Sequence, residues 1–309
     1  MTLSLVTGGA GFIGSHLATA LVRQGHHVRV LDNFSTGSRE NLAPLKDQIE
    51  LVEGDVRNAD MVALAVAGVD YIFHQAAFIS VPQSMVEPQT CFDINVRGTQ
   101  ILLEAARQED VQAVVLASSA AVYGANADMP LTEESKTQSL SPYAASKRMN
   151  EMQAELYTHV FNLPTVALRY FNVYGPRQSP DSPYAAAIPI WTHRMLQGDV
   201  PTVFGDGGQS RDFVYVEDVV QANLVASQSR QAAGRPINVC SGQEVSLLDL
   251  LEALAELIPE APAPEFTEPR AGDIYRSLGD ATLAKQWLNF VPQTPFVDGL
   301  VKTVEWMRA

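Results

Sequence analysis

Short runs of apolar residues recur along the first half of the chain, and stretches with helical spacing separate most of them. The runs lie at positions 3–7, 28–31, 49–52, 71–73, 114–117 and 165–168. Short apolar runs without regular polar alternation are typical of strands buried on both faces. Strands that alternate with helices predict an α/β fold whose parallel sheet is doubly wound.

The pattern changes after residue 171, where loops replace the alternation. Prolines interrupt the next segment at positions 176, 180, 183 and 189. Two later runs, 213–216 and 237–239, again predict strands. We therefore expect a large domain over residues 1–171, to which 212–240 return, and a smaller, mixed α/β substrate domain over 172–211 and 241–309.

The composition is that of a folded, acidic chain. Of 309 residues, 46% are hydrophobic and 18% charged, which is ordinary for a globular protein. The 21 Lys and Arg against 35 Asp and Glu give a net charge of −14, which repels polyanions, so no nucleic-acid partner is expected. Without a long apolar segment or a secretory signal, we expect no membrane association and a cytoplasmic location.

Cysteines and histidines give no metal or disulfide pattern. Cys91 and Cys240 are far apart and belong to no CxxC motif. The six histidines lack the spacing of metal ligands, so no metal site is predicted.

A glycine cluster after the first apolar run predicts a dinucleotide-binding turn of the Rossmann type. Gly8, Gly11 and Gly14 lie between a predicted strand and a helix predicted over 15–24. Without side chains, this backbone can approach a pyrophosphate at the positive end of the helix. Asp32 ends the second run, where its carboxylate can accept both ribose hydroxyls and would repel a 2′-phosphate. The sequence therefore predicts NAD rather than NADP.

Tyr143 and Lys147 are candidates for acid–base chemistry, because four residues separate them in a predicted helix and both project from one face. A free tyrosine has a pKa of about 10, and lowering it by about three units takes roughly 4 kcal/mol of preferential phenolate stabilisation. A neighbouring ammonium and a cationic nicotinamide can supply it. Ser118 and Ser119 end a predicted strand at the edge where such sheets bind ligands, so a hydroxyl there can relay the proton.

Several motifs occur together along essentially the whole chain. They are the segments 7–14, 32–33, 54–56, 74–77, 118–124, 141–147, 169–175 and 209–213. In this combination the chain resembles the extended short-chain dehydrogenase/reductases, specifically the nucleotide-sugar 4-epimerases. The resemblance implies that Ser119, Tyr143 and Lys147 are catalytic and that Ser118 lines the cofactor.

The resemblance also implies a mechanism. Tyr143, assisted by Ser119, removes the proton of the sugar C4 hydroxyl while C4 gives a hydride to the nicotinamide. Lys147 holds the nicotinamide ribose and stabilises the phenolate. The 4-keto sugar then turns about its pyrophosphate link and takes the hydride back on its other face. NAD is regenerated in each turnover and is expected to copurify.

The resemblance carries further site residues over to this sequence. For the cofactor they are Gly8, Gly11, Phe12, Ile13, Gly14, Asp32, Asn33, Ser35, Gly37, Asp55, Val56, Gln75, Ala76, Ala77, Asn95, Ser118, Tyr143, Lys147 and Tyr170. For a UDP-sugar substrate they are Ser80, Ser119, Tyr143, Asn172, Gln178, Ala186, Arg211, Arg270, Asp273 and Ser277. Arg211 and Arg270 match positions that bind the pyrophosphate and the nucleoside.

The segments 183–191 and 80–82 most resemble the branch that acts on UDP-N-acetylhexosamines. In this family a small residue at the position of Ser277 admits the 2-acetamido group. Ile79 departs from the branch, which carries glycine there, and its bulk acts against that group. The expected substrates are the pairs UDP-GlcNAc/UDP-GalNAc, UDP-Glc/UDP-Gal or both.

The same residues bear on three other functions. A 4,6-dehydratase requires an acidic pair where Ala120 and Ala121 stand, which argues strongly against dehydration. A UDP-glucuronate 4-epimerase or decarboxylase stays open, because one sequence does not reveal a carboxylate pocket. A non-catalytic NAD-sensing protein is the remote alternative, opposed by the retained Ser119, Tyr143 and Lys147.

The resemblance implies a homodimer in which two helices from each subunit form a four-helix bundle. The candidate segments are residues 95–108 and 143–161.

Overall fold

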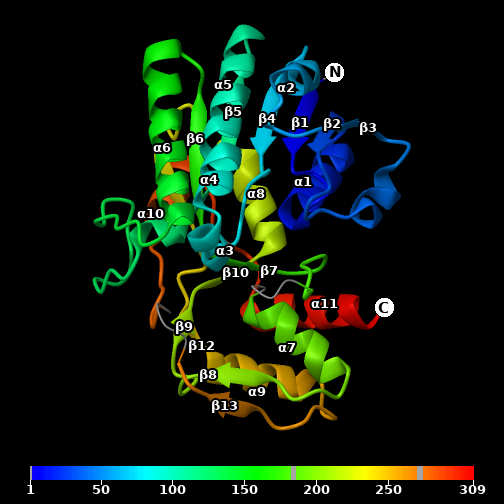
Figure 1. Cartoon of the computed structure of the whole chain (residues 1–309), viewed down its shortest axis with the longest axis vertical. Coiled ribbons are helices and arrows are strands. Elements are labelled where there is room, and N and C mark those ends of the chain that lie inside the picture. The colour runs from blue at the N-terminus through cyan, green and yellow to red at the C-terminus, as the bar shows by residue number, and fades with distance from the viewer. Residues whose placement is uncertain (1, 182–185, 270–273) are drawn as a thin grey trace.

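A parallel sheet of seven strands organises the large part of the molecule (Figure 1). The computed structural model describes residues 2–181, 186–269 and 274–309. Its strand order is β11-β6-β5-β4-β1-β2-β3. The strands are β1 (Leu3–Thr7), β2 (His27–Asp32), β3 (Ile49–Glu53), β4 (Tyr71–His74), β5 (Ala113–Ser119), β6 (Thr165–Tyr170) and β11 (Pro236–Val239). Each of the six early apolar runs forms one of these strands, which confirms the predicted α/β fold class.

Helices cover both faces of the sheet. On one face lie α1 (Phe12–Arg23), α8 (Val216–Ala226) and α10 (Thr282–Leu288). On the other face lie α2 (Ala59–Val66), α5 (Gly98–Gln108) and α6 (Pro142–Phe161). Successive side chains of β5 point to opposite faces of the sheet. Val115 packs with the core on the α1 face, whereas Val114 and Leu116 pack with the core on the α2 face. The sheet is therefore doubly wound, as predicted.

Short helices lie in the segments between these strands and longer helices. They are α3 (Val81–Val86), α4 (Pro88–Phe92), a π-helical turn η2 (Asp93–Arg97), and the 3₁₀ helices η1 (Arg39–Leu45) and η3 (Ala120–Tyr123).

A smaller mixed α/β part lies below the large sheet in Figure 1. Its helices are α7 (Ala187–Leu196), α9 (Leu247–Leu257) and α11 (Phe296–Arg308). Three two-stranded sheets accompany them: β10 (Phe213–Tyr215) with β7 (Asn172–Tyr174), β12 (Val245–Ser246) with β9 (Ser210–Arg211), and β13 (Glu265–Thr267) with β8 (Thr202–Phe204). Its core includes Trp191, Leu250, Leu254 and Leu300.

Two predicted elements differ from the structure in their bounds. The helix predicted over 15–24 begins at Phe12, with Gly11 as its N-cap, because Gly14 has no side chain to push the first turn away from Gly8. The run at 213–216 forms a strand over its first three residues, which pair with β7 outside the large sheet, and Val216 begins α8. The run at 237–239, by contrast, lies beside β6 in the large sheet.

A buried carboxylate connects the segments around β10. Asp212, which is 0% exposed, accepts hydrogen bonds from the Ser241 backbone and hydroxyl, from Gly242 N and from Gly279 N. Burial raises its pKa to about 6, although these four donors act in the opposite direction. One side chain thus fixes the start of β10, the loop after β11 and the segment before α10.

We expect His74 on β4 to make stability depend on pH. Its ring contacts the hydroxyls of Thr7 and Thr99 at 2.7 and 3.0 Å, and burial, with the charge of Lys147, lowers its pKa to about 3. In the unfolded chain a histidine takes up its proton near pH 6.5, so stability falls as the pH drops from there towards 3. Between pH 7 and 5 the loss from this group is about 2 kcal/mol.

Urea unfolding of His74→Gln at the two pH values measures this effect. The difference in the free energy of unfolding between pH 7 and pH 5 should shrink by about 2 kcal/mol. The exposed His193→Gln should leave it unchanged. An unaltered pH dependence in His74→Gln would contradict the assignment.

Candidate active site

The carboxyl ends of the central strands open into a cleft of about 1060 Å³, its open mouth included. The implied cofactor residues line this cleft, with the exceptions of Gly37 and Asn95. Six residues that the prediction missed also line it: Leu31, Thr36, Gly54, Ile79, Ile94 and Ala117. Gly54 belongs to a motif already singled out, whereas Ala117 contributes a backbone oxygen, which no side-chain pattern could have revealed.

The turn after β1 leaves no room for side chains. Gly8 has φ of +67°, and a Cβ there would come within 2.6 Å of Ala76 N. A Cβ on Gly14 would come within 2.1 Å of Gly8 O. Gly37 packs behind this turn, where a Cβ would come within 2.8 Å of the Ala10 backbone. The turn therefore presents bare backbone at the start of α1, as a pyrophosphate requires.

Asp32 and Asp55 form the wall beside the turn. Asp32 is 7% exposed, and its two oxygens accept hydrogen bonds from Ala10 N and Phe34 N, each at 2.8 Å. Asp55 accepts from Arg57, which holds the pKa of that carboxyl at about 2, and from Asn33. Each carboxylate is thus oriented by one donor from the loop after its own strand, Phe34 N or Arg57, and by one donor from the loop after the neighbouring strand, Ala10 N or Asn33.

A hydrogen-bonded group closes the floor of the cleft. Gln75 Nε2 donates to Tyr170 Oη at 3.1 Å and to Asn223 Oδ1 at 3.2 Å, and Tyr170 Oη donates to the same Asn223 oxygen at 2.9 Å. Burial raises the pKa of Tyr170, so its phenol stays neutral.

Asn95 has a different position from the one expected of a cofactor residue. Its amide donates to Phe78 O at 3.0 Å and to Ser146 Oγ at 2.9 Å, and its oxygen accepts from Phe78 N at 2.7 Å. It therefore holds the loop before α3 against α6.

Tyr143, Lys147 and Ser119 meet beside the cleft. Ser141 caps α6 by accepting from Ala144 N, which sets the helix so that Tyr143 and Lys147 face the end of β5. Burial raises the pKa of Tyr143, while a hydrogen bond with Ser119 opposes the rise. Lys147 Nζ donates to Ala117 O at 2.8 Å and lies 5.8 Å from the centre of the Tyr143 ring.

Burial lowers the pKa of Lys147 to about 8. The ammonium is therefore still largely protonated near neutral pH and can favour a phenolate at Tyr143. A hydroxyl, a phenol and an ammonium in this order can transfer a proton to or from a bound hydroxyl.

Three of the implied substrate residues gather around β9 and β10. Arg211 Nη1 donates to Ser210 O at 2.8 Å, and Ser277 N donates to the same oxygen at 3.2 Å. Asn172 Nδ2 donates to Asp212 O at 3.2 Å. The structure thus brings together residues that lie up to 105 positions apart in the printed sequence.

The remaining substrate predictions lie on separate elements. Ser80 caps α3, Ala186 precedes α7, and Gln178 donates to Val173 O while its own oxygen is buried without a partner in the described structure. Arg270 and Asp273 lie outside the described residues.

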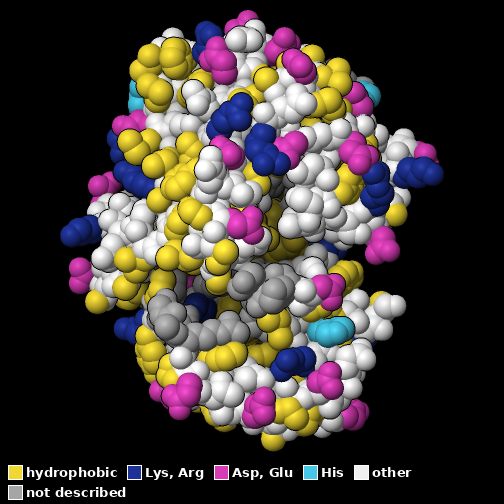
Figure 2. All heavy atoms as spheres, in the orientation of Figure 1, with side chains coloured by type: hydrophobic (Ala, Val, Ile, Leu, Met, Phe, Trp, Pro, Cys, Tyr) yellow, Lys and Arg dark blue, Asp and Glu magenta, His cyan; other side chains and the backbone are white. Residues whose placement is uncertain are grey.

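A second hollow was not anticipated from the sequence. It is lined by Phe204, Gly205, Asp206, Gln209, Thr267, Glu268, Pro269 and Tyr275. The surface is also hollowed elsewhere, between the large and the small part of the molecule (Figure 2). The glycine-rich turn at 205–208 gives no sign of this hollow in the sequence, because Tyr275, whose hydroxyl contacts Asp206 at 3.2 Å, comes from a distant segment.

The described residues form neither a membrane-spanning helix nor a metal-binding cluster. No helix among them is long and apolar enough to cross a bilayer. No cluster of three or more His, Cys, Asp or Glu in those ranges could hold a metal ion.

A model of the NAD dependent epimerase/dehydratase family matches residues 4–240. The chain belongs to this family. The family's UDP-glucose 4-epimerase from Mycolicibacterium smegmatis is 40% identical to it, over 99% of this chain and 98% of that protein. The crystal structure of the UDP-glucose 4-epimerase of Thermotoga maritima with UDP-glucose is 36% identical, covers 99% of both chains and has a TM-score of 0.95.

A UDP-N-acetylglucosamine 4-epimerase from Methanobrevibacter ruminantium M1, in complex with UDP-N-acetylmuramic acid, is 37% identical with a TM-score of 0.95. The match covers 99% of this chain and 98% of that one. These similarities confirm the resemblance to nucleotide-sugar epimerases that the motifs indicated.

The family contains more than one reaction. Relatives named UDP-N-acetyl-alpha-D-glucosaminuronate decarboxylase (Bacillus cytotoxicus) and dTDP-glucose 4,6-dehydratase (Streptomyces niveus) are 33% and 35% identical, over 98% of this chain and 97% and 92% of theirs. Membership therefore supports an NAD-dependent enzyme of the nucleotide-sugar epimerase/dehydratase type and does not choose its reaction.

We expect Gly14→Ala to lose bound NAD, because the new methyl group would displace the first turn of α1 from the Gly8 loop. Retention of the dinucleotide through purification should fall about tenfold or more. Heat-released nucleotide, quantified by chromatography, measures the loss.

Gly25→Asn is the matched control at the other end of α1. That position has φ of +82°, which asparagine tolerates, and nothing lies within 4 Å of a new Cβ. Equal NAD content in both variants would exclude the turn as the pyrophosphate site.

Proposed function

We propose that the protein is an NAD-dependent 4-epimerase of a UDP-hexose. The observation that carries the proposal is that Tyr143 and Lys147 line the same cleft as the glycine turn. The Lys147 ammonium lies 5.8 Å from the centre of the Tyr143 ring, and Ser119 acts to lower the pKa of Tyr143. This arrangement supplies an acid–base group next to a dinucleotide site.

The residues of the cleft fit NAD. The backbone of the Gly8–Gly14 turn would hold the pyrophosphate, Asp32 the adenosine ribose and Lys147 the nicotinamide ribose. When bound, NAD supplies the oxidant for the sugar C4 carbon and later returns the same electron pair.

Tyr143 acts as the base and then as the acid. Its phenolate accepts the proton of the C4 hydroxyl, with the Ser119 hydroxyl as a hydrogen-bond partner. Lys147, protonated below pH about 8, favours the phenolate. The phenol gives the proton back when the sugar is reduced from its opposite face, which inverts C4.

The small part of the molecule would hold the UDP group. Arg211 and Asn172 supply donors suited to the pyrophosphate. The hollow lined by Phe204, Gln209 and Tyr275 offers an aromatic and amide surface for the nucleoside.

We assign UDP-GlcNAc/UDP-GalNAc, UDP-Glc/UDP-Gal or both as the substrate pairs. The small Ser277 leaves space for a 2-acetamido group, whereas Ile79, 64% exposed on the wall of the cleft, acts against it. Ala120 and Ala121, which occupy the positions of the dehydratase acids, argue against dehydration. A UDP-glucuronate 4-epimerase or decarboxylase is the alternative, because a relative named UDP-N-acetyl-alpha-D-glucosaminuronate decarboxylase is 33% identical.

Incubation of the purified protein with UDP-GlcNAc, without added cofactor, tests the proposal. Proton NMR of the anomeric signals should show UDP-GalNAc. If UDP-GlcNAc is not converted but UDP-glucose is, the enzyme is an epimerase whose pocket excludes the acetamido group. Conversion of neither would contradict the proposed function.

Tyr143→Phe should lower kcat by about 10²- to 10⁴-fold while bound NAD is retained, because the acid–base group is lost and the cleft is otherwise intact. Tyr71→Phe is the control, since the Tyr71 hydroxyl donates a solvent-exposed hydrogen bond to Gln112 and does not line the cleft. Turnover of Tyr143→Phe at the wild-type rate would refute the mechanism.

We further propose a homodimer that includes the outer face of α6. Met149, Met152, Leu156 and Val160 lie at helical spacing and are 42%, 57%, 47% and 60% exposed. This apolar stripe is suited to a second copy of the same helix.

Light scattering should therefore give twice the monomer mass for the wild type. The double variant Met152→Glu/Leu156→Glu should be monomeric, because two charges would be buried in the interface. Leu64→Glu, at a 59% exposed position on α2, should remain dimeric. A monomeric wild type would overturn this proposal.

A further inference from the structure

Arg169 is a buried cation in β6, a strand in which every residue is buried. It is 1% exposed, and its guanidinium binds both oxygens of Glu151, at 2.7 and 2.9 Å. Its third nitrogen donates to Tyr123 Oη at 2.9 Å. Burial acts to lower the pKa of Arg169, but the charge and hydrogen bonds of Glu151 outweigh it and raise the pKa. The cation is therefore permanently charged and uses all three of its nitrogens.

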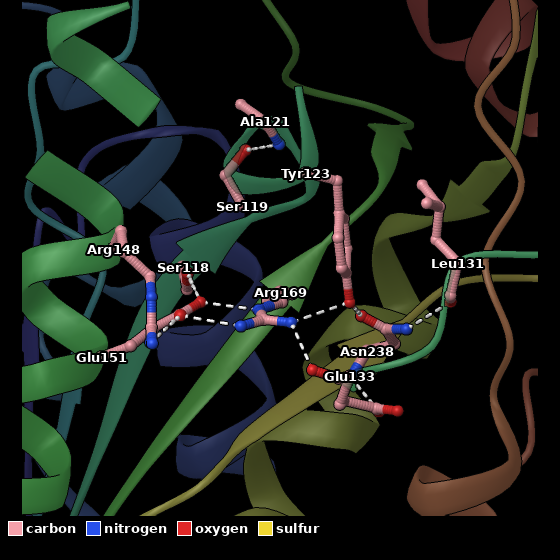
Figure 3. A network of polar contacts seen from close by, with 10 residues as sticks. All are labelled: Ser118, Ser119, Ala121, Tyr123, Leu131, Glu133, Arg148, Glu151, Arg169 and Asn238. Atoms are coloured by element: carbon pink, nitrogen blue, oxygen red, sulfur yellow. Dashed lines mark hydrogen bonds and ion pairs between the residues drawn. The ribbon is translucent and has the colours of Figure 1, made fainter. Parts of the chain in front are cut away.

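One arm of this network reaches the residue before Ser119. Glu151 Oε1 accepts from Ser118 Oγ at 2.6 Å, as Figure 3 shows. The side chain of Glu151 is 1% exposed, so this carboxylate is withdrawn from water together with its partners. Ser118 is thereby fixed through its side chain at the end of β5.

The other arm reaches the turn after Ser119. Ser119 is the N-cap of η3, because its hydroxyl accepts from Ala121 N at 3.1 Å, and Tyr123 is the last residue of that turn. Tyr123 Oη accepts from Arg169 and donates to Asn238 Oδ1 at 2.6 Å, and both contacts are drawn in Figure 3. Arg169 therefore holds the chain on both sides of Ser119.

The same network sets α6 against the strand end. Tyr143, Lys147 and Glu151 follow one another at four-residue spacing, so they share one face of α6. Their partners are three consecutive residues of β5: Ser119 acts to lower the pKa of Tyr143, Lys147 binds Ala117 O, and Glu151 binds Ser118. The contact between Glu151 and Ser118 is thus one of three attachments of α6 to the end of β5.

We propose that Arg169 is a positioning residue which, through Glu151 and Tyr123, holds the Ser119 hydroxyl against the Tyr143 phenol. The inference rests on the proposed roles of Ser119 and Tyr143 in proton transfer. Proton transfer requires hydrogen-bond contact, and a displacement of about 1 Å can cost about 100-fold in rate. Arg169 itself touches neither partner of that contact, so its effect is transmitted entirely through the two arms.

Arg169→Lys is the direct test. Lysine keeps a positive charge beside Glu151 but has a single nitrogen in place of the planar fork whose three nitrogens bind both Glu151 oxygens and Tyr123. We expect kcat to fall about 10- to 100-fold while KM changes less than about threefold and NAD still copurifies. Arg148→Gln is the matched control, because Arg148 binds the same carboxylate from the exposed side, at 3.0 Å. Its kcat should equal that of the wild type.

A double-mutant cycle with Ser119→Ala separates positioning from a general loss of structure. If Arg169 acts through Ser119, Arg169→Lys should lower kcat less than about threefold once the hydroxyl is absent. Effects that multiply in the double variant, or an unchanged kcat in Arg169→Lys alone, would overturn the proposal. If Arg169→Lys does not fold, Tyr123→Phe takes its place in the double-mutant cycle. This variant keeps the ion pair of Arg169 with Glu151 and removes the hydrogen bond between Arg169 and the Tyr123 hydroxyl.

The two proposals fail in different ways. An active wild type that is impaired by Ser119→Ala but unaffected by Arg169→Lys overturns only the positioning role. A wild type without turnover, or a Ser119→Ala variant with wild-type turnover, overturns the proposed function and this inference together.

Discussion

Parallel pairing of β1 with both β2 and β4 is the constraint from which the site follows. In register, Thr7 lies opposite Leu31 on one side and His74 on the other. Because the three strands end together, the glycine turn, Asp32 and the segment after His74 reach the same edge of the sheet. Further along that edge, β5 delivers Ala117 and Ser119 to α6. Strand pairing thus brings the segments proposed to bind the cofactor and to carry Ser119 to one edge of the sheet.

Much of this arrangement follows from local sequence. The apolar runs form the large sheet, and the glycine turn with Asp32 lies where a dinucleotide needs it, because both depend on patterns a few residues long. The start of α1 was predicted three residues too late, because the glycine-rich segment is typical of a turn although its last residues are already helical. The run at 213–216 forms its strand outside the large sheet, next to Asp212, which is anchored to loops, and no periodicity reports such an anchor.

The parts that could not be read from the sequence depend on distant contacts. The Ala117 oxygen that binds Lys147 belongs to the backbone, so no residue type marks it. The hollow near Asp206 needs Tyr275, which reaches it only after the chain has passed through β11 and α9. The motif containing Arg169 was visible, but its connection to both sides of Ser119 requires Glu151 and Tyr123 in three dimensions. The roles assigned to Arg270 and Asp273 stay predictions.

The anchoring of the chain by Asp212 also bears on how such enzymes can diversify. The backbone on both sides of residue 278 is fixed, since Ser277 N binds Ser210 O and Gly279 N binds the Asp212 carboxylate. A side chain at position 277 can therefore change in size while the main chain keeps its path. If Ser277 borders the sugar pocket as proposed, a single nucleotide change at that codon would alter the width of the pocket while the backbone hydrogen bonds on both sides are kept. The scaffold would then hold the main chain constant while the side chain that meets the substrate varies.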